Sequence, residues 1–161
     1  MAVLLAGIVL FRPIVIMFAL ITLGAISIIY KRYVSIGIDL ELCSFCAVAV
    51  GSVYGAKAGA LSGGISMLAA LILNGHAMQN ALFAAIKILT VSFLGIIAAA
   101  TAGGHLVLVA TLYTFLADAL FVFIAVNTGG NLGNLAVFLV THTLFVVYQL
   151  NFLLPLVKTI M

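Results

Sequence analysis

Charged residues are almost absent from this chain, and their scarcity constrains the fold more than any other feature. Six lysines and arginines and three acidic residues make up 6% of the 161 residues, whereas hydrophobic residues make up 67%. Ordinary soluble domains are about 25% charged. A soluble globule of this composition would leave large apolar patches in water, which monomeric proteins avoid. We therefore predict a membrane protein whose surface contacts the lipid bilayer.

Six apolar runs, separated by polar or glycine-rich breaks, predict six transmembrane helices. A spanning helix needs about 20 residues, so the chain has room for about six spans in one domain, residues 1–161. The predicted spans are residues 13–30, 39–54, 55–73, 79–102, 105–126 and 134–157, and Pro155 is expected to end or bend the last one. The expected fold is all-α, a polytopic bundle of membrane helices.

The first residues are apolar but do not form a span of their own. Residues 2–11 are too short to cross a bilayer, so they either extend the first helix, with Pro13 as a kink, or lie in the membrane interface. Residues 1–30 lack a basic start and a convincing cleavage site, and further spans follow. We therefore expect this segment to be retained rather than removed as a secretion signal.

The few basic residues neither orient the chain in the membrane nor form a surface for nucleic acid. Lys31 and Arg32 lie at one end of the predicted bundle and Lys57 and Lys158 at the other, so the positive-inside rule gives no preference. The net charge of +3 comes from scattered residues, and no run is dense enough to follow phosphates. We expect no nucleic-acid partner.

Glycines recur at four-residue spacing across the predicted second and third helices. The series is Gly51, Gly55, Gly59 and Gly63, with Ala60 and Gly64 beside it. In lipid, small residues at this spacing let neighbouring backbones approach closely. We therefore predict that these two helices pack tightly into the bundle, which is a structural role.

Motifs for catalysis or metal binding are missing from the sequence. It contains no H-E-x-x-H, no G-x-S-x-G, no P-loop and no acidic cluster that would hold magnesium. Cys43 and Cys46 form a C-x-x-C pair in an apolar helix, which is more typical of two buried small side chains than of a redox or metal pair. A zinc site from His76, His105 and His142 is disfavoured because His105 is expected near the opposite end of the bundle. We expect neither an enzyme nor a resident cofactor or metal.

Polar residues collect in three connections that emerge at the same end of a six-span bundle. They belong to the first, third and fifth connections and are Lys31, Arg32, Asp39, Glu41, Asn74, His76, Gln79, Asn80, Asn127, Thr128, Asn131 and Asn134. The connections at the opposite end, around Lys57 and Gly103, are short and poor in donors. Polar loops at one end of a bundle suit a small-molecule site or a partner surface, or are simply hydrated.

Three ionisable residues, Lys87, Asp118 and His142, lie inside the predicted spans. Each is placed roughly 12 Å below the polar end of the bundle by the helical rise. Charges at membrane depth are costly and tend to face a partner or a cavity. We predict a Lys87–Asp118 ion pair with His142 nearby, which either forms the floor of a ligand pocket or only fixes helix register. The candidate substrate-binding residues are Asp39, Glu41, His76, Lys87, Asp118, Asn127, Asn131 and His142.

Residues 37–75 carry a pattern that is known from a family of membrane proteins. They read GIDLELCSFCAVAVGSVYGAKAGALSGGISMLAALILNG, in which a YGxKxGA turn is followed by a helix of small residues and a loop. This stretch resembles the second and third helices of the substrate-binding S components of energy-coupling factor (ECF) transporters. The chain length, the six predicted helices and a last helix with His142 and Asn151 extend the resemblance over the whole chain.

The resemblance implies a receptor in a prokaryotic plasma membrane that binds a vitamin-like small molecule. Such a receptor docks on a transmembrane coupling protein driven by two ATPases, and its ligand lies under the first, third and fifth connections. Family members carry small residues at four-residue spacing on the first helix for docking, a spacing that Ala2 and Ala6 share. Nickel and cobalt are not expected as substrates, because the chain lacks the histidine-bearing amino terminus of metal-transporting members.

Two alternatives involve no ligand. A similar six-helix pattern occurs in the rod-shape-determining membrane protein of the bacterial cell-wall elongation machinery, where a D-L pair like Asp39 and Leu40 precedes the glycine helix. That resemblance implies a scaffold, and a small structural subunit of a larger membrane complex is the other alternative. The intramembrane ionisable residues favour a receptor, whereas the lack of a cavity at their level would favour a scaffold.

Overall fold

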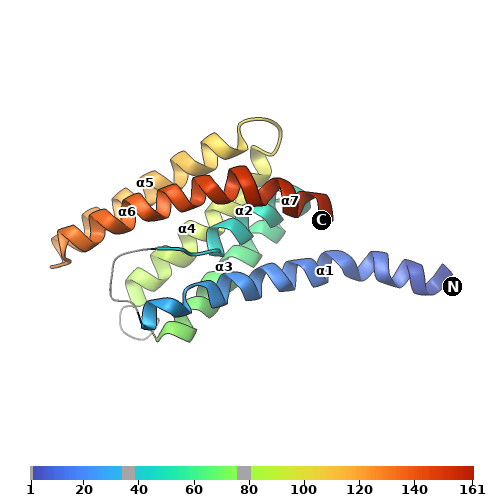
Figure 1. Cartoon of the computed structure of the whole chain (residues 1–161), viewed down its shortest axis with the longest axis horizontal. Helices are drawn as coiled ribbons and strands as arrows, with labels where there is room; N and C mark the ends of the chain where they lie inside the picture. Colours follow the sequence, from blue (N-terminus) through green and yellow to red (C-terminus); the bar gives the residue numbers. More distant parts are fainter. Residues whose placement is uncertain (1, 34–38, 76–80) are drawn as a thin grey trace.

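Helices form all the regular structure of the described residues, 2–33, 39–75 and 81–161, in a computed structural model of the chain (Figure 1). The long helices are α1 (Ala2–Ser27), α3 (Ala56–Asn74), α4 (Ala81–Ala100), α5 (Leu106–Asn127) and α6 (Leu132–Tyr148). The shorter elements are the 3-10 turn η1 (Ile29–Arg32), α2 (Cys43–Tyr54), the π-helical turn η2 (Gln149–Leu153) and α7 (Leu154–Ile160).

Five of the helical segments are long and apolar enough to cross a membrane. They are Phe11–Lys31, Ala56–Asn74, Ala81–Ala100, Leu106–Asn127 and Leu132–Ile160. Their outward side chains are large and apolar, with Phe18 at 71% and Leu116 at 65% exposure. Such a surface is stable against lipid rather than water. The prediction of an all-α, polytopic membrane bundle is therefore confirmed.

The second predicted span is shorter than expected. The sequence predicted a helix over residues 39–54, but α2 begins only at Cys43 and has 12 residues. At 1.5 Å per residue it is roughly 18 Å long, which is less than the roughly 30 Å of a bilayer core. Residues 43–51 are all buried, so α2 is a short central helix enclosed by the longer ones.

Close backbone contacts through glycine hold α2, α3 and α4 together. A Cβ atom added to Gly95 would overlap the backbone of Gly59, and one added to Gly51 would overlap the carbonyl oxygen of Gly95. Gly59 in turn lies against the backbone of Gly51. The predicted tight packing of the two glycine-rich helices is confirmed, and α4 joins them through Gly95, which lies outside the predicted series. Gly55, at φ +91°, makes the turn between α2 and α3.

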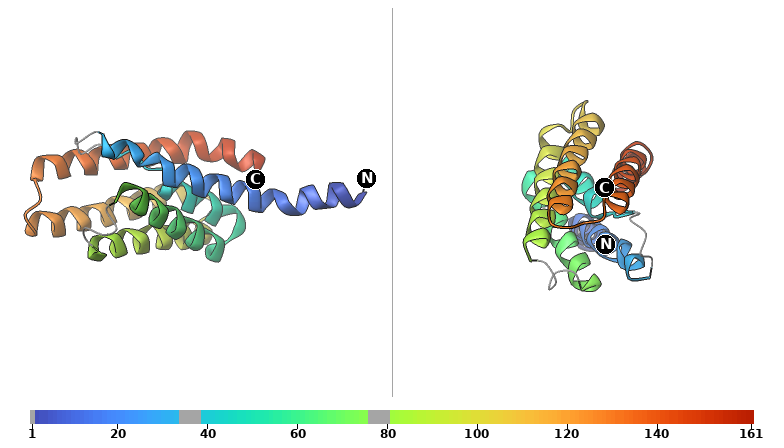
Figure 2. Two further views of the ribbon diagram at one scale, coloured as in Figure 1. Left: turned by 90° about the horizontal axis from the view of Figure 1, so that it is seen from below. Right: turned by 90° about the vertical axis from the view of Figure 1, so that its left-hand side faces the viewer.

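The described helical elements that lead into the three polar connections end at the same end of the bundle, as predicted. Figures 1 and 2 show the carboxyl ends of η1, α3 and α5 at one end, and both termini at the other. Residues 2–11 extend the first helix, since α1 runs without interruption through Pro13. Near the opposite end of the molecule, the Arg12 guanidinium donates to the carbonyl oxygen of Ile160 over 2.6 Å.

A reporter placed at either terminus should be accessible from the same side of the membrane. The chain has five long apolar helical segments and the shorter helix α2, and its last helix ends at the end of the bundle where the first one begins (Figure 1). Protease accessibility of amino- and carboxyl-terminal tags in sealed vesicles measures this, with a cysteine at Gly129 labelled from the other side as the control. Tags on opposite sides would mean that α2 does not return the chain across the bilayer.

Pro155 does not end the last helix. Proline removes a backbone donor and clashes with the carbonyl four residues earlier, here that of Asn151. The chain accommodates this by widening into the π-helical turn Gln149–Leu153 and then continues as α7 to Ile160. Gln149, the first residue of the wide turn, is fully buried and reaches the segment before α2.

Candidate functional site

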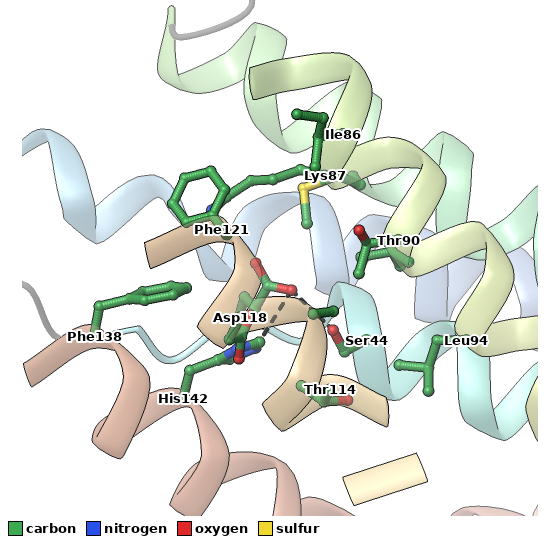
Figure 3. Close-up of a pocket in the computed structure, with 14 residues that line it drawn as sticks. Ser44, Ile86, Lys87, Thr90, Leu94, Thr114, Asp118, Phe121, Phe138 and His142 are labelled. Carbon is green, nitrogen blue, oxygen red and sulfur yellow. Dashed lines mark hydrogen bonds and ion pairs between the residues drawn. The ribbon is translucent and has the colours of Figure 1, made fainter. Parts of the chain in front are cut away.

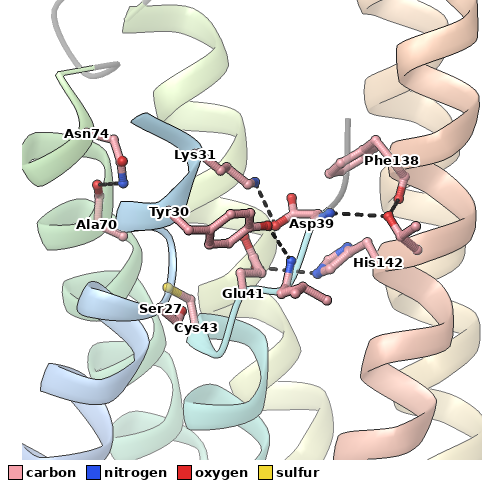
Figure 4. A network of polar contacts seen from close by, with 12 residues as sticks. Ser27, Tyr30, Lys31, Asp39, Glu41, Cys43, Ala70, Asn74, Phe138 and His142 are labelled. Carbon is pink, nitrogen blue, oxygen red and sulfur yellow. Dashed lines mark hydrogen bonds and ion pairs between the residues drawn. The ribbon is translucent and has the colours of Figure 1, made fainter. Parts of the chain in front are cut away.

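All three acidic side chains of the protein converge at one place in the bundle. Asp39, Glu41 and Asp118 are buried, with 0%, 2% and 8% exposure. They lie with three basic side chains, Lys31, Lys87 and His142, and we call these six residues the charged cluster (Figures 3 and 4). The helical rise places Lys87, Asp118 and His142 roughly 9 to 15 Å below the polar ends of their helices.

His142 on α6 lies between two carboxylates. Its Nδ1 and Oδ2 of Asp118 share a hydrogen bond of 2.6 Å, whereas its Nε2 lies 3.6 Å from Oε1 of Glu41, beyond hydrogen-bond distance. The same Glu41 oxygen accepts a hydrogen bond of 3.0 Å from the Ser44 hydroxyl. A neutral imidazole donates from one nitrogen only, so only the protonated ring can donate toward both acids. In this structure Nε2 makes no hydrogen bond, so the ring is held chiefly through Asp118.

Glu41 precedes α2 and lies outside the five long spans. Burial raises the pKa of its carboxyl, but the facing His142 ring and the charges of Lys87 and Lys31 outweigh burial and lower the pKa to about 2. A negative charge at this position also complements the amino end of α2. The surroundings of Glu41 therefore favour its ionised form.

Side chains of neighbouring helical elements hold the segment before α2, residues 39–42, in its non-helical form (Figure 4). Three of its backbone N–H groups donate to side-chain oxygens, namely Asp39 to Thr141, Leu40 to Tyr30 and Leu42 to Ser27. The carbonyl of Glu41 accepts 2.8 Å from the Gln149 amide. Irregular backbone is tolerated at membrane depth only when its polar groups are satisfied within the protein. These bonds explain why α2 starts at Cys43.

Lys31 and Asp39 form an ion pair beside this segment. The Lys31 Nζ lies 2.6 Å from Oδ1 of Asp39, whose side chain is fully buried. The pair links the end of η1 to the segment before α2. The Lys31 ammonium of η1 thereby neutralises one carboxylate of the cluster.

Lys87 does not pair with Asp118, so the predicted ion pair is wrong. Its ammonium lies instead 5.2 Å from the ring centre of Phe121 and 5.4 Å from that of Phe138. Within the described residues, no carboxylate oxygen lies within 4 Å of the Lys87 Nζ. The physical reason is that His142 already engages Asp118, while the two rings attract the ammonium through their π faces.

Two cavities meet at Lys87. The smaller, about 30 Å³, lies against Glu41, Asp118 and His142 (Figure 3). The larger, about 280 Å³, extends toward the polar end of the bundle, and we call it the chamber. Its walls include Ile28, Lys31, Met67, Asn74, Phe83 and Ala84. Met67, Lys87 and Phe121 line both cavities. The chamber is just below the roughly 300 Å³ at which ligand pockets begin.

Five of the eight predicted substrate-binding residues lie at the smaller cavity or beside it. Glu41, Lys87, Asp118 and His142 line the smaller cavity, and Asp39 binds Lys31 beside it. His76 lies outside the described residues.

The two predicted loop asparagines lie away from both cavities. Asn127 is exposed and donates to the carbonyl of Phe123, whereas Asn131 accepts from the Asn134 amide and caps α6. They are distant because α5 and α6 extend beyond the level of the charged cluster (Figure 1).

Some site residues were not among the predicted ones. The sequence indicates Lys31 only as a loop residue, and the predicted site does not include Phe121 and Phe138. Helical spacing could have indicated both rings, because Phe121 is three residues after Asp118 and Phe138 four before His142. Residues three or four apart share a helix face.

The described residues contain no group of three or more His, Cys, Asp or Glu side chains arranged to hold a metal ion. Cys43 and Cys46 are buried, free thiols. No family model, no curated protein and no solved structure matches the chain.

Proposed function

We propose that this chain is the substrate-binding subunit of a small-molecule uptake transporter in a prokaryotic plasma membrane. It binds its ligand in the chamber and performs no catalysis. The observation that carries this proposal is the chamber itself, which joins the charged cluster and extends toward the polar end of the bundle. A small molecule from the aqueous side would enter at that end.

The energetic cost of the cluster supports a binding role. Ionised groups in a low-dielectric interior lose hydration, and replacing a buried ion pair by apolar residues is often neutral or stabilising. A scaffold that only needs helix register would be served by apolar packing such as the glycine contacts of α2, α3 and α4. Charges retained at this depth beside a cavity are better explained by recognition of a ligand.

The resemblance of residues 37–75 to the S components of ECF transporters supports the transport part of the proposal. Under this reading the subunit docks on a transmembrane coupling protein that two ATPases drive. The ligand is then released inward when the assembled transporter changes conformation.

Affinity capture tests this assignment. The tagged full-length chain is purified in mild detergent from membranes of its native host, and an unrelated tagged membrane protein serves as the control. We expect specific recovery of a transmembrane coupling protein together with two ATPases. Recovery of cell-wall elongation proteins in their place would instead support a scaffold and contradict the proposal.

A further inference from the structure

Lys87 is the cation of the charged cluster that has no carboxylate in contact. Lys31 pairs with Asp39, and His142 lies between Glu41 and Asp118. The Lys87 ammonium carries three N–H donors, and the two ring faces beside it attract its charge without offering conventional acceptors. It is therefore the group that an incoming acceptor can engage without breaking a protein ion pair.

The walls of the chamber favour an anion. Two lysines, Lys31 and Lys87, line it, and none of its lining residues is acidic. The three carboxylates lie on the other side of Lys87 or against Lys31. A cationic ligand would meet the charge of Lys87 there, which no carboxylate contacts, whereas an anionic one would meet the unoccupied donors of Lys87.

The other residues that line the chamber indicate what the part of the ligand away from Lys87 is made of. Phe83 and Phe121 pack edge to face with ring centres 5.3 Å apart, and aliphatic side chains complete the wall. At the polar end, Oδ1 of Asn74 is buried and accepts no hydrogen bond, while its amide nitrogen donates to Ala70. A compact apolar body with a donor at one end would fit these groups.

We propose that the chamber binds a small organic acid whose carboxylate pairs with Lys87 and whose apolar body lies against Phe83 and Phe121. This inference rests on the proposed binding function and names its ligand class. A soluble aromatic acid and a medium-chain fatty acid share this chemistry. The test therefore uses one of each.

The test is equilibrium binding to the purified full-length chain, with 4-hydroxybenzoate and octanoate as the two acids. Their uncharged amides and the corresponding amines are matched controls of the same size. We expect the acids to bind and the amides and amines to bind at least tenfold more weakly. Binding of 4-hydroxybenzoate indicates a soluble ligand, whereas binding of octanoate alone indicates a lipid-derived one.

Variants at Lys87 separate recognition from a structural role. Hydrogen bonds to charged groups contribute about 1.5–3 kcal/mol, so Lys87→Met should weaken acid binding about 10- to 100-fold, and Lys87→Arg should retain it. The double variant Lys87→Met with Asp118→Asn removes one charge of each sign and preserves the charge balance of the cluster. It should fold and still fail to bind the acids. Recovery of acid binding in this double variant would overturn the inference.

Failure of the inference is distinguishable from failure of the proposed function. If amides or amines bind as well as the acids, the chain is a receptor but its ligand class is different. If acid binding is unchanged in Lys87→Met, the chain is a receptor but Lys87 does not pair with the carboxylate, and the inference fails. If no probe of any charge binds, small molecules released from the purified protein are identified by mass spectrometry. An acid among them supports the inference, a molecule without an acid group overturns it alone, and an empty protein overturns both.

Discussion

Gly95→Val should prevent the bundle from folding. Any Cβ at this position would overlap the backbone of Gly59, and backbone cannot move aside as a flexible side chain can. Overpacking a core typically costs 1–3 kcal/mol, and we expect about 3 kcal/mol or more here because three helices meet at this contact. The measurement is the yield of monodisperse protein and its unfolding temperature in detergent.

The matched control is Gly103→Val. Gly103 lies in the connection between α4 and α5, and nothing lies within 4 Å of a Cβ added there. This variant should be expressed and should unfold like the wild-type protein. Equal stability of the two variants would show that α3 and α4 do not approach each other as closely as described.

Asp118→Ala should be the most destabilising substitution within the charged cluster. It removes the closest partner of His142 and leaves a buried imidazole with one distant carboxylate. Stranding one member of a buried pair typically costs about 3–5 kcal/mol. Asp118→Asn keeps an acceptor for the ring nitrogen and should therefore lose less stability than Asp118→Ala.

A double-mutant cycle identifies the partner of Asp118. The stability effects of Asp118→Ala and His142→Ala should be coupled, because these side chains are in contact. The effects of Asp118→Ala and Lys87→Met should be more nearly additive. Stronger coupling to Lys87 than to His142 would restore the ion pair that the sequence predicted and the structure replaced.

The overall fold was predictable because lipid imposes simple requirements. Apolar runs of the right length predict spans, and glycines at four-residue spacing predict close helix packing. The start of α2 was not predictable. Residues 39–42 read Asp-Leu-Glu-Leu and contain no glycine or proline that would keep a helix from starting there. They are irregular in the structure, where Tyr30, Thr141 and Gln149, distant in sequence, bond to their backbone.

The sequence predicted how deep the ionisable residues lie in the bundle, but not which of their side chains contact each other. Counting residues from the helix ends placed Lys87, Asp118 and His142 at similar levels, and all three line one cavity. Which of them touch depends on how each helix is rotated and how far each side chain reaches, and counting residues gives neither. Polar composition also pointed to Asn127 and Asn131, which lie beyond the cluster because α5 and α6 are long.

Native mass spectrometry of the intact protein, released from its own membranes, tests the central claim that the chamber holds a small molecule. The comparison is with Ala84→Phe, a variant that fills the chamber with an aromatic ring from its own wall. We predict that the wild-type chain carries one small molecule of defined mass and that the variant folds but carries none. A wild-type chain without a bound molecule, or the same adducts in both proteins, would contradict the account.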